Sequence, residues 1–181
     1  MNRISIPSHD TAPEASRPLL DAVKSQLGVV PNLFRLIANS PRVLEGFLGL
    51  NAAVGKTLDV KTRERIALAV AEINGCDYCL SAHTYLGSNM ARLDDSEISL
   101  AREGRSADMR ANAAVSFAAK VARTRGRVED ADLAAVKAAG FSDAEIVEIV
   151  AVVAENFFTN ILNNVAETEI DFPVVRSQFA A

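Results

Sequence analysis

The chain has 181 residues, a length that suits one domain and can bury a substantial core without disulfide or metal staples. Its composition, 49% hydrophobic and 23% charged, is typical of a packed globular protein and excludes a disordered one. The net charge of −4, with no block of lysine and arginine, argues against nucleic-acid and membrane-surface partners.

The N-terminal stretch MNRISIPSHDTAPEAS has no apolar segment of the kind that a signal peptide needs. The most apolar run, IVEIVAVVAENFF, carries two glutamates and is far shorter than the ~20 apolar residues of a membrane crossing. We therefore expect a soluble, cytoplasmic protein. In such a protein two cysteines are more often catalytic, metal-binding or incidental than a structural disulfide.

Helical patterns follow one another along almost the whole chain, and strict period-2 alternation is hard to find. An extended arm is expected over residues 1–18, which contain three prolines, followed by a short helix ending at Gly28 and a turn at VVPNLF. Further helices are predicted over residues 40–55, 60–73, 76–89, 94–104, 107–126, 129–140 and 144–170.

These patterns predict an all-α fold, a helical bundle of about seven or eight helices. We assign a single helical domain to residues 19–173, the extended arm to residues 1–18 and a C-terminal tail to residues 174–181. Ser142 and Glu145 form a capping box that opens the last helix. Because that helix is apolar on more than one face over residues 146–162, we expect it to be buried on most sides, and oligomerisation would bury surplus apolar surface.

The stretch EINGCDYCLSAHT holds both cysteines of the chain and one of its two histidines. Cys76, Cys79 and His83 stand at positions i, i+3 and i+7, which fall along one face of a helix. Two thiols one turn apart can close a disulfide with little backbone movement, and the exposed N–H groups of a helix start favour a thiolate at Cys76. His83 lies one turn beyond Cys79, within reach of its proton.

A histidine base usually has an orienting carboxylate. The chain is expected to reverse at Asn74-Gly75, so that two antiparallel helices bring residue 64 alongside residues 83–86. Spacing alone therefore makes Glu64 a candidate partner of His83.

The segment RERIALAVAEINGCDYCLSAHT resembles the core motif of the AhpD-like alkyl hydroperoxidases, within the carboxymuconolactone decarboxylase superfamily. That motif has a glutamate, a CxxC twelve residues on and a histidine four residues after the second cysteine, which Glu64, Cys76, Cys79 and His83 match. The flanks LGVVPNLFRLIANSP and TNILNNVAETEIDFP are similar to the peroxidase-related branch, so the resemblance covers roughly residues 20–173.

The resemblance implies an AhpD-like, all-helical enzyme that reduces organic hydroperoxides or hydrogen peroxide through a dithiol–disulfide cycle. Cys79 would be the peroxidatic nucleophile, activated through His83 and Glu64, and Cys76 the resolving thiol. The helix-end dipole favours Cys76 as the thiolate, but an adjacent base is the more directed activation and favours Cys79.

The same resemblance implies an external dithiol reductant, for which the family offers a lipoyl group or a redox protein, and a homo-oligomer, a trimer or hexamer. No metal, flavin, haem or other cofactor is implied. This chain departs from the founding type at Tyr78, where relatives have a histidine between the cysteines, and tyrosine is a poor proton shuttle with a reference pKa near ~10. Relatives of the peroxidase-related branch often have a histidine where Asn164 stands.

Three other interpretations of the cysteine pair remain open. A zinc site lacks a fourth ligand unless Glu64 completes it, and no second CxxC or HxxxH exists. Two inert buried cysteines would leave the adjacent His83 without a role. A non-enzymatic redox sensor or dithiol-exchange protein would use the same CxxC, and only multiple turnovers of peroxide would exclude it as the whole function.

Asparagine recurs at helical spacing within the apolar last helix, at Asn156, Asn160, Asn163 and Asn164. Because asparagine is a poor helix former, four in this short stretch need a reason. Hydrogen bonding to neighbouring helices or to a partner subunit is one. The other is that Asn160 or Asn163 lines the pocket near the thiols.

Overall fold

The computed structural model describes residues 3–178, and within them all regular structure is helical, which confirms the all-α prediction. Within this range, a 3-10 turn at Glu14–Ser16 precedes nine α-helices, one more than the upper expectation. Their bounds are α1 Arg17–Leu27, α2 Asn32–Ile37, α3 Pro41–Val54, α4 Val60–Ile73, α5 Asp77–Asn89, α6 Asp95–Arg102, α7 Met109–Thr124, α8 Asp130–Ala138 and α9 Asp143–Ala166.

The N-terminal segment differs from the sequence prediction in two places. The 3-10 turn and the start of α1 fall within the arm that was expected to be extended, because Pro18 sits in the first turn of α1, where a missing N–H costs nothing. The stretch VVPNLF is not only a turn, since α2 begins directly after Pro31. Residues 1–2 of the predicted arm and 179–181 of the predicted tail lie outside the described residues.

Helix α4 is the central helix of the bundle and packs against α5, α6, α7 and α9. Every residue from Arg65 to Glu72 is buried, and the two charged ends of this run are paired, Arg65 with Glu97 and Glu72 with Arg102, each at 2.8 Å. Buried charges are stable only when paired in this way. The most completely buried helix is therefore the one that carries Glu64.

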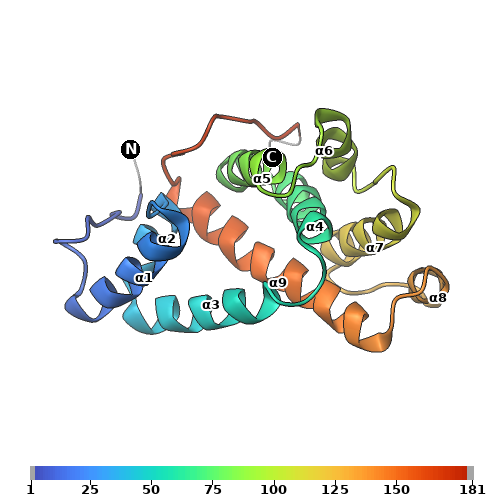
Figure 1. Ribbon diagram of the computed structural model, residues 1–181, viewed down its shortest axis with the longest axis horizontal. Helices are drawn as coiled ribbons and strands as arrows, with labels where there is room; N and C mark the ends of the chain where they lie inside the picture. The colour runs from blue at the N-terminus through green and yellow to red at the C-terminus, as the bar shows by residue number, and fades with distance from the viewer. Residues whose placement is uncertain (1–2, 179–181) are drawn as a thin grey trace.

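Helix α9 crosses the middle of the molecule, with α1 to α3 on one side and α4 to α8 on the other (Figure 1). It begins at the predicted capping box of Ser142 and Glu145. Buried residues occupy most of its sides, as expected. One face remains exposed, and we call its apolar residues the α9 stripe: Val147, Val150, Phe158, Ile161 and Val165.

The segment after α9 runs back over α5 (Figure 1). Ile170, Phe172 and Val175 pack against the apolar cluster that contains both cysteines. Val175 N–H donates to Ser81 Oγ at 2.9 Å, and Ser177 N–H donates to Asp77 Oδ1 at 2.8 Å. Residues 174–178 of the predicted tail are thus bonded to the first two turns of α5, and Val175 packs against the cluster that contains the cysteine pair.

Candidate active site

The cysteine pair is positioned by the connection between α4 and α5. Asn74 ends α4, and Gly75 has φ of 60°, a left-handed conformation that glycine adopts without strain. Cys76 is the N-cap of α5, and its sulfur accepts the N–H of Cys79 at 3.3 Å. A cap of this kind fixes the Cys76 side chain over the first turn, where Cys79 stands.

Both thiols are free and buried, with Cys76 0% and Cys79 3% exposed. Their sulfur atoms lie 2.7 Å apart, and Cys76 Sγ donates toward Cys79 Sγ. Asn163 lies in the last turn of α9, and its Nδ2–H donates to Cys79 Sγ at 3.2 Å. Cys79 is therefore the acceptor of two hydrogen bonds, an arrangement that suits a thiolate.

The two thiols have opposite pKa shifts. Burial alone would raise the pKa of Cys79, but the hydrogen bond from Cys76, the charge of His83 and the amides of Asn163 and Asn160 lower it to about 7. The pKa of Cys76 is raised, because Cys76 donates to Cys79 and because it is buried. These environments favour the negative charge on Cys79, against the helix-end argument that favoured Cys76.

His83 lies one turn beyond Cys79 on α5, and Glu64 approaches it from α4. His83 Nδ1 is 2.9 Å from Glu64 Oε2, so the structure brings together the pair that chain reversal suggested. A carboxylate only accepts, so Nδ1 carries a proton in this contact. Burial would lower the pKa of His83, but the Glu64 charge and hydrogen bond outweigh it and raise that pKa.

A second carboxylate near His83 was not identified from the sequence. Glu155 of α9 is buried, at 8% exposed, and accepts the Asn51 amide at 2.8 Å. Burial raises the pKa of Glu155, while its charge contributes to the raised pKa of His83. A glutamate inside the most apolar helical run was the available signal, but nothing in the linear pattern placed it beside His83.

The asparagines of α9 divide between packing and the site. Asn156 donates to the Val152 carbonyl of its own helix, and Asn164 donates to the Asn74 carbonyl, both at 2.9 Å. Asn160 is fully buried, and its Oδ1 accepts the Asn74 amide at 2.9 Å. Asn163 contacts the Cys79 sulfur. Each of the two expectations therefore holds for some of these asparagines. Asn160 and Asn164 bond the connection between α4 and α5, and Asn163 lies beside the thiol.

Tyr78 points away from the sulfur atoms and toward α2. Its hydroxyl accepts the Leu33 N–H at 3.1 Å, and its ring packs edge-on against Phe172 at 5.8 Å between centroids. Burial raises the pKa of its phenol. The residue that replaces a histidine between the cysteines therefore anchors α2 and the tail.

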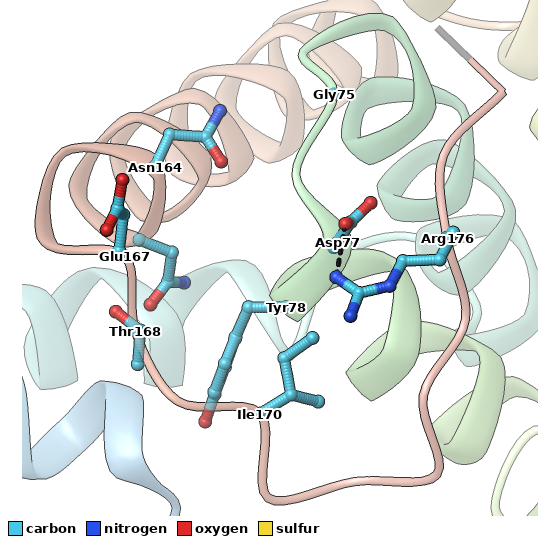
Figure 2. A pocket seen from close by; sticks show the side chains of 9 residues that line it. Gly75, Asp77, Tyr78, Asn164, Glu167, Thr168, Ile170 and Arg176 are labelled. Carbon is cyan, nitrogen blue, oxygen red and sulfur yellow. Dashed lines mark hydrogen bonds and ion pairs between the residues drawn. The ribbon is translucent and has the colours of Figure 1, made fainter. Parts of the chain in front are cut away.

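A pocket of about 350 Å³ opens beside the start of α5. The end of α9, the tail and the first residues of α5 line it, with Asp77, Tyr78 and Thr168 around its interior (Figure 2). Asn163 belongs to this lining and also bonds Cys79, so one side chain separates the pocket from the sulfur. Neither cysteine lines the pocket itself.

Residues 3–178 contain neither a metal-binding cluster nor a membrane-spanning helix. No group of three or more histidine, cysteine, aspartate and glutamate side chains there is arranged to hold a metal ion. No helix in that range combines the length and apolarity that a membrane crossing demands.

The model of the carboxymuconolactone decarboxylase family matches residues 41–124, the range that contains all four residues of the Glu64–Cys76–Cys79–His83 group. An uncharacterized protein from Haemophilus influenzae is 53% identical over 45 residues. That match covers 24% of this chain and 40% of the relative, so the chain spans less than half of the length of the curated relative.

Solved structures match over nearly the whole chain. An uncharacterized peroxidase-related protein from Ralstonia eutropha JMP134, described as an alkylhydroperoxidase AhpD core, is 24% identical with a TM-score of 0.82, covering 94% of this chain and 92% of that one. A peroxidase-related protein from Silicibacter sp. TM1040 is 25% identical, with a TM-score of 0.81 and coverage of 93% and 91%. The debrominase Bmp8 shares the fold at 20% identity, with a TM-score of 0.77 and coverage of 93% and 92%.

Proposed function

We propose that this chain is an AhpD-like member of the carboxymuconolactone decarboxylase superfamily, and that it is a thiol peroxidase that reduces hydroperoxides through Cys79 and Cys76. The observation that carries the proposal is the polarity of the cysteine pair. Cys79 accepts hydrogen bonds from Cys76 and Asn163 and stands one turn from the His83–Glu64 pair. A thiol held in this way is ionised near neutral pH, and the thiolate is the nucleophilic form.

In the first step the Cys79 thiolate attacks the distal oxygen of the hydroperoxide ROOH. The S–O bond forms, the O–O bond breaks, and its electron pair leaves with RO⁻, which takes up a proton to give the alcohol. Cys79 is left as a sulfenic acid. The proton lost from the Cys79 thiol balances the proton gained by the alkoxide, and His83 is placed to hold it between the two events.

In the second step Cys76 attacks the sulfenic sulfur, the disulfide forms and hydroxide leaves with the Cys76 proton as water. The raised pKa of Cys76 has its largest cause in the hydrogen bond to Cys79. Once Cys79 is an uncharged sulfenic acid, that cause is weakened, and the Cys76 thiol ionises more readily at the stage that needs it. An external dithiol then reduces the disulfide, and a reducing, cytoplasmic setting suits that cycle.

The test is steady-state reduction of cumene hydroperoxide by fully reduced wild-type protein, with dihydrolipoamide as the reductant. We expect many turnovers per active site. The alternative function, a redox sensor or dithiol-exchange protein with the same cysteine pair, predicts one equivalent of peroxide consumed and no sustained rate. A rate equal to the background of peroxide with dihydrolipoamide alone would contradict the peroxidase.

We further propose that the protein is a homo-oligomer, a trimer or hexamer, that buries the α9 stripe against other copies. Ile161 and Val165, 55% and 54% exposed, are apolar residues that a monomer leaves in water. Ile161→Glu, which would bury a charge, is expected to raise the subunit dissociation constant at least about tenfold. Light scattering after size exclusion measures this, with Met109→Glu as a matched exposed control. A monomeric wild type would contradict the proposal.

A further inference from the structure

Asn163 both lines the pocket and contacts the reactive sulfur of Cys79. Its Nδ2–H donates to Cys79 Sγ, whereas its Oδ1 is buried and has no hydrogen-bond partner among residues 3–178. The residue as a whole is 2% exposed. Buried amide oxygens in proteins are nearly always paired, so an open acceptor beside a reactive group indicates a place where a donor binds.

Thr168 presents a second open group to the same pocket. Its side chain lines the cavity, the residue is 7% exposed, and its Oγ1 likewise lacks a partner within the described residues (Figure 2). The Thr168 N–H donates to the Asn163 carbonyl at 3.1 Å, and this backbone bond fixes the two residues relative to each other. The lining residues therefore carry two oxygen atoms without a partner among residues 3–178, one that accepts and one that can accept or donate.

The charged side chains around the pocket are already paired. Asp77 lies 2.7 Å from Arg176, and Glu167 lies 2.5 Å from Arg3. The apolar contribution to the lining comes from Ile170 and the Tyr78 ring. A charged ligand would have to compete with these ion pairs, and a long hydrocarbon chain would meet mostly polar walls, so the lining suits a neutral molecule that forms hydrogen bonds.

We propose that this pocket binds the organic part of the substrate, and that the substrate is a small, neutral hydroperoxide rich in hydrogen-bonding groups. The inference rests on the proposed peroxidase function. The hydroperoxide O–H donates to Asn163 Oδ1, which holds the distal oxygen beside the sulfur that the other end of the same amide contacts. Thr168 bonds a polar group of the organic part.

During the reaction this placement favours the bond changes given above. The Cys79 sulfur bonds to the distal oxygen, the O–O bond breaks, and the alkoxide, after protonation, remains in the pocket as the alcohol. Asn163 keeps one hydrogen bond to the sulfur and one to the transferred oxygen, so it binds the sulfenic acid as well as the peroxide.

Two probes with the same number of non-hydrogen atoms separate polarity from size: 5-hydroperoxymethyluracil, which is neutral and polar, and cumene hydroperoxide, which is apolar. The rate constant for oxidation of the pre-reduced protein is measured in a single turnover, by quenching with an alkylating agent and counting free thiols by mass spectrometry. This design needs no reductant. For the wild type we expect the uracil compound to react at least about tenfold faster than cumene hydroperoxide.

Thr168→Val keeps the shape of the side chain and removes its hydroxyl. It should lower the rate constant for 5-hydroperoxymethyluracil about three- to tenfold and shift the ratio of the two rate constants toward cumene hydroperoxide. Thr84→Val is the matched control, because Thr84 Oγ1 is also buried without a partner among the described residues but does not line the pocket. Its ratio should equal that of the wild type.

The outcomes separate this inference from the function on which it rests. If neither peroxide oxidises the cysteine pair faster than an unstructured dithiol, the peroxidase itself is wrong and the inference falls with it. If both react but cumene hydroperoxide is preferred, or if Thr168→Val leaves the ratio unchanged, the peroxidase stands and the pocket assignment is overturned.

Discussion

Replacing Cys79 with serine is expected to lower kcat/KM for any hydroperoxide at least about a thousand-fold, to the rate of the uncatalysed reaction. A serine hydroxyl stays protonated at neutral pH and is not oxidised by peroxide, whereas the Cys79 thiol has its pKa lowered to about 7. Cys76 does not substitute for it, because Cys76 is fully buried and lacks the contacts with Asn163 and His83 that support a thiolate at Cys79. The measurement is steady-state peroxide consumption, with circular dichroism to show that the variant is folded.

Cys76→Ser is the matched control, because it removes the neighbouring sulfur and leaves the nucleophile. This variant should consume one equivalent of peroxide per chain in a rapid burst and then stop, since a sulfenic acid forms on Cys79 but no intramolecular disulfide closes. If Cys79→Ser shows the burst and Cys76→Ser does not, the assignment is contradicted. Cys76 would then be the nucleophile and Cys79 the resolving thiol.

Glu64→Gln is expected to move the pH profile of Cys79 reactivity upward. Glu64 raises the pKa of His83, which favours the charged imidazolium, and this positive charge lowers the pKa of Cys79. Without the carboxylate the pKa of His83 falls, the imidazolium is less favoured, and the thiolate loses part of its support. We expect the midpoint of Cys79 alkylation, near 7 in the wild type, to rise by about one pH unit.

The rate of iodoacetamide labelling, measured across pH, reports this shift. An upward shift of the midpoint is the result specific to the loss of the Glu64 charge. Well below the wild-type midpoint the variant should react about tenfold more slowly than the wild type, and at high pH the two rates should converge because both thiols are then ionised. Glu45→Gln, which removes the same charge from an exposed pair with Arg42, should leave the profile unchanged. A uniform loss of rate at every pH would indicate a damaged fold and contradict the role of Glu64.

Local sequence patterns predicted the parts of the fold that depend on neighbouring residues. The capping box at Ser142 and the chain reversal at Gly75 both stand where short-range chemistry puts them. The reversal in turn places Glu64 beside His83, so two members of the site could be paired from spacing alone. Helix α2 was missed because a six-residue helix after Pro31 is too short to show a helical period.

Long-range packing accounts for what the sequence could not predict. The apolar pattern of α9 predicted a helix buried on most sides, but it could not show that one face stays exposed or that α4 is the more completely buried helix. Burial depends on which helices surround an element and not only on the composition of that element. Glu155 reaches the neighbourhood of His83 through the packing of α9 against α5. The pocket likewise needs the tail folded over α5, a contact between distant segments that no periodicity reports.

The central claim is that Cys79 is the sulfur that attacks peroxide, and trapping its oxidised form tests that claim most directly. Cys76→Ser protein is treated with one equivalent of hydroperoxide in the presence of dimedone, which reacts with sulfenic acids, and the adduct is located by peptide mass spectrometry. The account predicts a stoichiometric adduct on Cys79. An unmodified Cys79 with the peroxide unconsumed would contradict it.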